Sequence, residues 1–355
     1  MEEPEEEQEN KILCLSFNKE NTLFAIGTLE GFAIFTAYPF EKTYQRSTKG
    51  GVGFIELLSH SNLVALVGST SSGELKENDL YLWDQKEEHT IMNIHFLSPI
   101  KNIKLKRDII LIVLEQFIYI LELATFQQKE KISTAHNPKG VISISSNIYI
   151  NVIAYPDIKD GYVKVQSFDE ETKGCSVIKA HNNKLGCIQL NNVAKYLATT
   201  SILGTVIRII DLETSLVVME LRRGTEMAEI FSLCFDFFSK FLTCTSDRGT
   251  VHIFSIENLH KTPEEINVEN GEVATKNQKS SWTKLSSWFS YFNSEWSFAQ
   301  FRITDPKSLC VFAGNTNNRL VVISSEWKYY ECGFDIHKGG ECEVYKDINL
   351  ELEFE

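Results

Sequence analysis

Apolar and polar residues alternate in short runs along most of the chain, and turn-forming residues separate the runs. The clearest case is a pair of segments, 195–210 and 240–255, in which Lys-aromatic-Leu precedes T-S-x-x-G-T-V at the same spacing. Each segment is typical of a β-hairpin, with an apolar strand, a short turn containing glycine and a second alternating strand. Looser copies of this pattern end at Phe35, Trp83, Ile120, Val165 and Ile323.

The two best-matched hairpins begin 45 residues apart. A period of roughly 40 to 45 residues, with several short strands per unit and almost no helical periodicity, indicates a β-propeller. We therefore predict an all-β fold, a seven-bladed β-propeller with four-stranded antiparallel blades, as a single domain over 11–345. The expected units are 11–48, 49–93, 94–134, 135–178, 179–222, 223–293 and 294–345. Only Leu82-Trp83-Asp84 and Ile210-Asp211 resemble the Trp-Asp signature of ordinary repeat propellers.

The sixth unit is too long, and its excess forms an insertion at 257–294. Five apolar residues of this insertion fall on one face of a helix, opposite Ser, Thr and Lys284. They are Trp282, Leu285, Trp288, Phe289 and Phe292. Such a face is buried either at the interface of a bilayer or against the rim of the propeller, and the sequence leaves both alternatives open. The polar composition of 261–280 favours disorder in the free protein.

The net charge of −13 is concentrated at the two ends of the chain. Six acids lie within the first nine residues and six within the last fifteen. We therefore predict acidic tails at 1–10 and 346–355, which either solvate the protein or bind a partner. The remainder is close to neutral and has room for local basic pockets, although a nucleic-acid partner is not expected.

Several functional classes are disfavoured by what the sequence lacks. The eight cysteines form no C-x-x-C pair, which argues against a zinc site and against a disulfide framework. No apolar run approaches the roughly 20 residues of a membrane-spanning helix, and the acidic N-terminus is unlike a signal peptide, so a cytoplasmic protein is expected. No P-loop, Rossmann fingerprint, G-x-S-x-G or H-E-x-x-H motif is present, so we predict neither an enzyme nor a cofactor.

Arg222 and Arg223 are adjacent, at the junction of the two best-matched units. Successive side chains of an extended strand point to opposite faces, so the two arginines serve two different pockets. Guanidinium groups, hydroxyls and imidazoles together are suited to phosphate oxygens. The first candidate pocket comprises Arg222, His181, Ser201, Thr205 and Arg208, and the second comprises Arg223, Ser246, Thr250 and His252. The alternatives remain open that the Arg-Arg-Gly segment is a solvated turn and that His181 is a structural hydrogen-bond donor.

The same residues carry a resemblance to a known family. Arg222-Arg223-Gly224, the LATTS and GTVIR segments at 197–208 and the TSDRGTVHIF run at 245–254 resemble the PROPPIN family of phosphoinositide-binding propellers. The resemblance extends to Ser16-Phe17-Asn18, to Gly31-Phe32 and to the SEWSFA segment at 294–299. Leu221 stands where the family has phenylalanine, a change that we expect to alter packing more than lipid contact.

The resemblance implies two lipid pockets that favour phosphatidylinositol 3-phosphate and phosphatidylinositol 3,5-bisphosphate. It also implies that the insertion enters the membrane, and that the edge of blades 2 and 3 recruits a protein partner of the autophagy machinery. The protein would then act reversibly at autophagic, endosomal or vacuolar membranes. Arg208 is the least secure member of its pocket, because strand alternation places it opposite Thr205. The rival hypothesis is a protein-interaction scaffold that binds no lipid.

Overall fold

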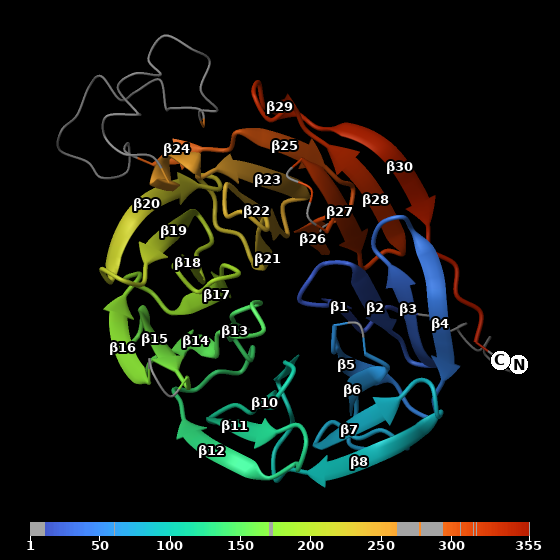
Figure 1. Ribbon diagram of the computed structural model, residues 1–355. Helices are drawn as coiled ribbons and strands as arrows, with labels where there is room; N and C mark the ends of the chain where they lie inside the picture. Colours follow the sequence, from blue (N-terminus) through green and yellow to red (C-terminus); the bar gives the residue numbers. More distant parts are fainter. Residues whose placement is uncertain are drawn as a thin grey trace, which may run out of the picture.

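The computed structural model shows seven small sheets arranged in a ring around a central channel (Figure 1). It describes residues 11–59, 61–169, 173–260, 277, 294–305, 307–314, 316 and 318–354. Within these ranges, five of the sheets have four strands, and the fifth and sixth blades each add a short fifth strand. The prediction of an all-β, seven-bladed propeller is therefore confirmed.

Blades 1 to 4 each consist of four consecutive antiparallel strands. Blade 1 contains β1 (Cys14–Phe17), β2 (Leu23–Gly27), β3 (Gly31–Thr36) and β4 (Glu41–Ser47). Blade 2 contains β5 (Val52–Leu57), β6 (Leu63–Gly68), β7 (Asp79–Asp84) and β8 (His89–His95). Blade 3 contains β9 (Asn102–Leu105), β10 (Ile109–Val113), β11 (Phe117–Glu122) and β12 (Gln128–Ser133). Blade 4 contains β13 (Ser143–Ile144), β14 (Val152–Pro156), β15 (Tyr162–Ser167) and β16 (Gly174–Lys179).

Strands that follow the insertion in the sequence complete blades 5 and 6. Blade 5 contains β17 (Leu185–Leu190), β18 (Tyr196–Ser201), β19 (Val206–Asp211), β20 (Leu216–Arg222) and the parallel β24 (Glu295–Trp296). Blade 6 contains β21 (Ile230–Phe235), β22 (Phe241–Ser246), β23 (Thr250–Ser255), β25 (Ala299–Arg302) and the parallel β29 (Gly340–Glu341). A 3₁₀ helix, η1 (Glu257–His260), follows β23. Blade 7 contains β26 (Ser308–Phe312), β27 (Arg319–Ser324), β28 (Lys328–Gly333) and β30 (Glu343–Asn349).

The limits of the last two units differ from those expected. The segment after residue 294 does not open blade 7, because β24 and β25 complete the outer edges of blades 5 and 6. At the C-terminus, β30 extends to Asn349, past the expected limit of 345, so the first four residues assigned to the acidic tail belong to a strand. The insertion separates these outer strands from the rest of their blades in the sequence, so the repeat spacing could not assign them correctly.

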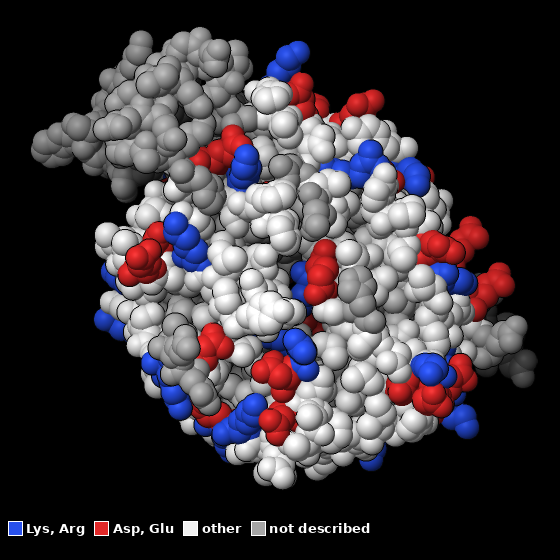
Figure 2. All heavy atoms as spheres, viewed as in Figure 1, with Lys and Arg blue, Asp and Glu red and all other residues white. Residues whose placement is uncertain are grey.

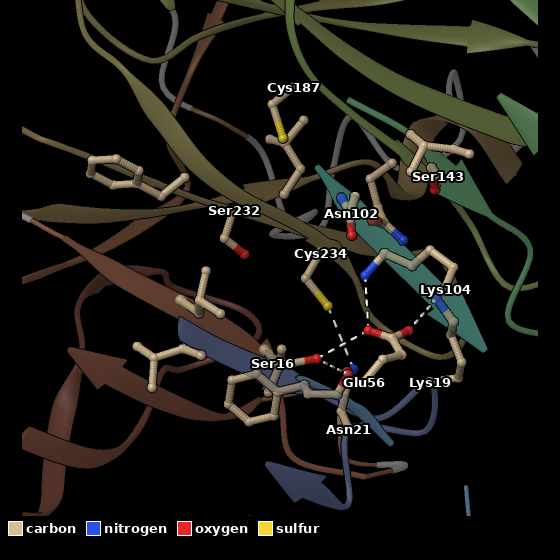
Figure 3. A pocket seen from close by; sticks show the side chains of 18 of the residues that line it. Ser16, Lys19, Asn21, Glu56, Asn102, Lys104, Ser143, Cys187, Ser232 and Cys234 are labelled. Atoms are coloured by element: carbon tan, nitrogen blue, oxygen red, sulfur yellow. Dashed lines mark hydrogen bonds and ion pairs between the residues drawn. The ribbon is translucent and has the colours of Figure 1, made fainter. Parts of the chain in front are cut away.

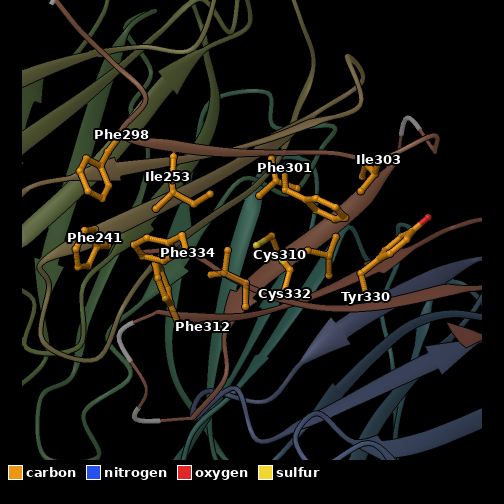
Figure 4. Packing of buried hydrophobic residues seen from close by; sticks show 14 residues of the cluster. Phe241, Ile253, Phe298, Phe301, Ile303, Cys310, Phe312, Tyr330, Cys332 and Phe334 are labelled. Atoms are coloured by element: carbon orange, nitrogen blue, oxygen red, sulfur yellow. The ribbon is translucent and has the colours of Figure 1, made fainter. Parts of the chain in front are cut away.

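Apolar side chains from neighbouring blades form the core of the ring. Between blades 6 and 7, the rings of Phe241, Phe298 and Phe334 pack against one another, with centroids 5.1 to 6.2 Å apart (Figure 4). The middle strands are buried on both faces, as in β10, where all five residues are buried. Alternation therefore gives way to continuous apolar runs in the middle of each blade.

Side-chain packing closes the ring between blades 7 and 1, and none of the described strands is exchanged between these two sheets (Figure 1). The Tyr329 hydroxyl donates a 2.9 Å hydrogen bond to the backbone oxygen of Ala37, and the Tyr329 ring lies 6.3 Å from that of Phe24. After β30, Leu350 is buried in the same cluster, and its amide donates to the backbone oxygen of Trp327 at 2.6 Å. We call this junction the seam.

Asn277, within the insertion, is firmly bound to the propeller. Its side chain is buried, accepts a 2.7 Å hydrogen bond from the amide of Ser255 and donates at 2.6 Å to the oxygen of the same residue. It also donates at 2.8 Å to Glu295 Oε2. The predicted membrane-inserting residues 282–292 lie outside the described residues. Among those that are described, no helix is long and apolar enough to span a bilayer.

Candidate functional site

Arg222 ends the outer strand of blade 5, and only 4% of its surface is exposed. It lies opposite Val206 in β19 and opposite Trp296 in the parallel strand β24. Its Nε atom donates a 3.0 Å hydrogen bond to Ser294 Oγ. The end of the insertion therefore returns to the propeller directly at this arginine.

Arg223 is held by the backbone of two turns, and 5% of its surface is exposed. Its amide donates to the Thr205 oxygen at 3.0 Å, and its Nε atom donates to the Gly204 oxygen at 2.9 Å. Its Nη2 atom also donates to the backbone oxygen of Glu226. Burial lowers the pKa of Arg223 below its ordinary value, although a guanidinium remains charged at any physiological pH.

The two arginines belong to opposite faces of blade 5. The Arg222 face contains Leu197 and Ile210, which pack against blade 4. The other face contains Leu221 and Ile207, which pack against blade 6. Arg222 therefore lies on the side of blade 4 and Arg223 on the side of blade 6. The expected division of the two arginines between opposite faces is therefore observed, and that each face forms a pocket stays a prediction.

A row of polar groups crosses blade 5 on the Arg222 face. Thr199, Arg208 and Glu220 lie opposite one another in β18, β19 and β20. Arg208 Nε and Nη2 approach Glu220 Oε2 at 2.8 and 2.7 Å, and Nη1 donates to the Ala180 oxygen at 2.7 Å. Arg208 thus shares the face of Arg222, but its charge is already paired with a carboxylate.

His181 begins blade 5 and is buried beside this row. Its Nε2 atom lies 3.0 Å from Thr199 Oγ1. Burial, and secondly the charge of Arg208, lower the pKa of His181 to about 4. Ser201 ends β18 on the same face, and its hydroxyl accepts a 3.3 Å hydrogen bond from the amide of Leu203. In this state His181 is neutral at pH 7, and its contact with Thr199 is of the structural kind that the sequence had left open.

Thr205 occupies a different position from Thr250, although the sequence pattern aligns them. β23 begins at Thr250, whereas β19 begins only at Val206, which leaves Thr205 in the turn. Thr199 and Cys244 are 45 residues apart, but their partners across the hairpins, Arg208 and His252, are 44 residues apart. The strand register of the blade 5 hairpin is therefore shifted by one residue relative to that of the blade 6 hairpin. Because of this shift, Arg208 takes the position in blade 5 that His252 holds in blade 6, and Thr205 contributes its backbone oxygen to Arg223.

The second set of predicted residues lies on the face of blade 6 that is turned toward blade 5. His252 lies opposite Cys244, which packs in the cluster between these blades. Burial, and secondly the charge of Arg223, lower the pKa of His252 to about 4. Among the described residues its buried Nδ1 atom has no hydrogen-bond partner. Ser246 is buried, and its hydroxyl accepts a 3.4 Å hydrogen bond from the amide of Arg248.

The sequence argument missed one basic residue of this second set. Arg302 lies opposite Thr250 at the end of the outer strand β25, as Arg222 lies opposite Val206 at the end of β20. The side chain of Arg302 is exposed. Arg302 could not be predicted from the spacing, because the insertion separates β25 from the rest of blade 6 and the repeat period assigned β25 to blade 7.

A cavity of about 730 Å³ occupies the central channel, and neither Arg222 nor Arg223 lines it. Its wall includes the buried carboxylate of Glu56, which Lys104 and Lys19 approach at 3.0 and 3.5 Å and to which Ser16 donates at 3.1 Å (Figure 3). Burial lowers the pKa of Lys19 to about 8, against the opposing effect of Glu56. Both lysines are paired with the one carboxylate, which links blades 1, 2 and 3 in a structural network. Elsewhere on the face in Figure 2, lysines and arginines are interspersed with acids in small groups.

Comparison with known proteins identifies the family to which the chain belongs. The PROPPIN family model matches residues 11–350, which is nearly the whole described chain. The chain belongs to the PROPPIN family. This membership confirms the resemblance drawn from the arginine motif, and it agrees with the prediction of a non-catalytic propeller.

Curated PROPPIN relatives match along almost their full length. Autophagy-related protein 18 of Dictyostelium discoideum is 30% identical over 357 residues, covering 96% of this chain and 94% of the relative. SVP1-like protein 2 of Pichia angusta is 30% identical over 332 residues, covering 90% of this chain and 89% of the relative. Of these two relatives, the first is named for autophagy.

Solved structures share the fold. Hsv2 of Kluyveromyces lactis superimposes with a TM-score of 0.75 at 20% identity, covering 96% of this chain and 100% of Hsv2. A complex of KlAtg21 with the coiled coil of AgAtg16 gives a TM-score of 0.76 at 20% identity, covering 96% of this chain and 100% of the matched chain. At this identity the likeness concerns the architecture of the propeller.

Proposed function

We propose that this PROPPIN binds phosphatidylinositol 3-phosphate and phosphatidylinositol 3,5-bisphosphate through two inter-blade pockets. The observation that carries the proposal is the placement of Arg222 and Arg223, two adjacent buried arginines directed to opposite faces of blade 5. Arg223 donates to neutral backbone oxygens, so those bonds orient the guanidinium without cancelling its charge. A preoriented guanidinium beside hydroxyl donors is suited to a phosphate monoester.

The first pocket would use Arg222, with Ser201 and His181 near it, and Arg208 would contribute once its pairing with Glu220 is relaxed. The second would use Arg223 with Ser246, Thr250 and His252, and Arg302 extends this set. A bound phosphate would raise the pKa of either histidine, because it places a negative charge beside a ring that is neutral when the pocket is empty.

The insertion would supply a membrane anchor next to the first pocket. Ser294, at its end, bonds to Arg222, and β24 then pairs with the same arginine. The aromatic residues Trp282, Trp288, Phe289 and Phe292, with Leu285, would enter the interface of the bilayer. Each anchor alone gives weak and reversible binding, and together they would make residence on the membrane stable.

The protein would act as a recruiting scaffold, moving reversibly between cytoplasm and autophagic, endosomal or vacuolar membranes. Its protein partner would bind the edge of blades 2 and 3. At that edge Leu97, in the connection from β8 to β9, is 99% exposed.

Flotation with liposomes tests the lipid proposal. The wild-type protein should float with vesicles that contain 3-phosphorylated phosphoinositides, and the Arg222→Thr/Arg223→Thr double variant should not. Arg46→Thr/Arg107→Thr is the matched control, because it removes the same charge from blades 1 and 3 and should leave flotation unchanged. If the wild type binds none of the lipids, or if both double variants bind equally well, the pockets are not lipid sites and a protein-interaction scaffold is the better description.

A further inference from the structure

Two exposed apolar side chains project from the turns that hold Arg223. Ile202, in the turn between β18 and β19, is 49% exposed, and Met227, in the connection from β20 to β21, is 60% exposed. The backbone oxygens of Gly204 and Glu226, within two residues of these side chains, accept hydrogen bonds from Arg223. The same short segments therefore build the pocket and present apolar groups to solvent.

The two turns are also joined to each other. The amide of Ala228 donates a 3.0 Å hydrogen bond to the backbone oxygen of Leu203. Gly204 has a φ of +60°, and a Cβ atom there would collide with the Ala228 oxygen. This close packing fixes the backbone of both turns relative to the guanidinium of Arg223.

Blade 4 repeats the arrangement beside the first pocket. Ile158, in the turn between β14 and β15, is 78% exposed. Gly161 in this turn accepts hydrogen bonds from the amides of Ala180 and His181, both at 2.9 Å. Thr205 accepts in the same way from the amides of Arg223 and Gly224. An exposed isoleucine thus accompanies each of the two turns that support a candidate phosphate pocket.

Arg248 lies beside the apolar tip at Met227. Its Nε and Nη2 atoms donate to the Met227 oxygen at 3.2 and 2.8 Å, and its Nη1 atom is paired with Glu226 Oε2 at 3.3 Å. The Arg248 side chain is about half exposed. Apolar tips with a neighbouring arginine are typical of surfaces that meet the boundary between lipid headgroups and acyl chains. A bilayer surface is the one partner that combines phosphate groups for the pockets with hydrocarbon for the tips.

We propose that Ile158, Ile202 and Met227 form a second, shallow membrane anchor, which enters the bilayer beside the bound headgroups independently of the blade 6 insertion. This anchor rests on the proposed lipid-binding function. It would orient the propeller, because the pockets and the apolar tips belong to the same bonded turns.

The test compares vesicle binding with binding of the soluble headgroup. Ile202→Ser/Met227→Ser, which removes the apolar groups without adding charge, should bind vesicles of phosphatidylcholine with phosphatidylinositol 3-phosphate roughly tenfold more weakly than the wild type, since two partly inserted side chains are lost. Its affinity for soluble inositol 1,3-bisphosphate should be unchanged, which also shows that the pocket is folded. Val193→Ser is the control, because Val193 is 47% exposed in the turn between β17 and β18, which holds neither arginine.

A variant with stronger vesicle binding gives a result that misfolding cannot produce. Ile202→Trp should strengthen vesicle binding a fewfold, because tryptophan favours the bilayer interface. Unchanged vesicle binding in both variants, with soluble headgroup still bound, would overturn the second anchor and leave the proposed pockets intact. A wild-type protein that binds neither vesicles nor the soluble headgroup would overturn the proposed function, and the anchor with it.

Discussion

Arg208 and Glu220 face each other across strands β19 and β20 and form an ion pair through two guanidinium nitrogens, at 2.8 and 2.7 Å from Glu220 Oε2. The pair lies on the face of blade 5 that carries Arg222, two residues along the strand from it. The carboxylate holds Arg208 in place, and it also opposes any anion that approaches this face.

Replacement of Glu220 should therefore strengthen binding at the first pocket. Glu220→Gln keeps a hydrogen-bond acceptor for Arg208 but removes the negative charge, and we expect affinity for phosphatidylinositol 3-phosphate vesicles to rise roughly two- to fivefold. Titration with vesicles measures the effect. Glu213→Gln, in the exposed turn at the far end of the same blade, removes the same charge and should change nothing; an equal gain in both variants would show a general charge effect.

Two glycines beside the arginines should respond differently to alanine. Gly204 has a φ of +60°, and its Cβ would meet the Ala228 oxygen, so Gly204→Ala should lower the free energy of unfolding by about 2 kcal/mol or more. A methyl group added at Gly224 would have no described atom within 4 Å, and Gly224→Ala should cost less than roughly 0.5 kcal/mol. Urea denaturation compares them, and similar losses would contradict the packing described for the two turns.

The buried histidines should make stability depend on pH. The pKa of His181 and that of His252 are lowered to about 4, whereas an unfolded chain takes up the proton near pH 6.5. The unfolded state then binds more protons below that pH, so the stability from neutral histidine is complete above 6.5 and is lost as the pH falls toward 4. At pH 5 each residue should cost roughly 2 kcal/mol.

Urea denaturation at pH 7 and pH 5 measures this loss. His181→Gln should reduce the difference between the two pH values, because glutamine does not titrate. His89→Gln, at an exposed position of blade 2, serves as the control and should leave the difference as it is in the wild type. A difference that is the same in all three proteins would show that other groups cause the acid sensitivity.

Asn277 should contribute to stability although most of the insertion around it lies outside the described residues. Asn277→Ala would leave the buried amide and oxygen of Ser255 without partners, and we expect a loss of about 1 to 3 kcal/mol. Thermal or urea unfolding measures it. Asn182→Ala, on an exposed connection, is the matched control, and an equal effect of both would contradict a structural role for Asn277.

The propeller was predictable from the sequence because its signal is local. Strand alternation and glycine turns lie within each hairpin, as in 195–210 and 240–255, and their repetition alone gives the ring. The division of Arg222 and Arg223 between two faces also follows from strand geometry, without knowledge of the neighbouring blades.

The remaining features depend on contacts between distant segments. Identical spacing in two hairpins did not reveal that Thr205 lies in a turn and Thr250 in a strand, since pairing is decided across strands and against the next blade. Arg302 was hidden because its strand returns to blade 6 only after the insertion. Glu220, which neutralises Arg208, gave no sign in the sequence that it lies opposite that arginine.

The seam also determines at which point of synthesis the ring of blades can close. Blades 1 to 4 are uninterrupted stretches of chain, so each can pair its own strands soon after it leaves the ribosome. Blade 6 must wait for β25, beyond the insertion, and the ring cannot close until Tyr329 and Leu350 reach blade 1. Until then the apolar face of blade 1 that surrounds Phe24 lacks the cover that these two residues give it, and an uncovered apolar sheet face is prone to association with other chains.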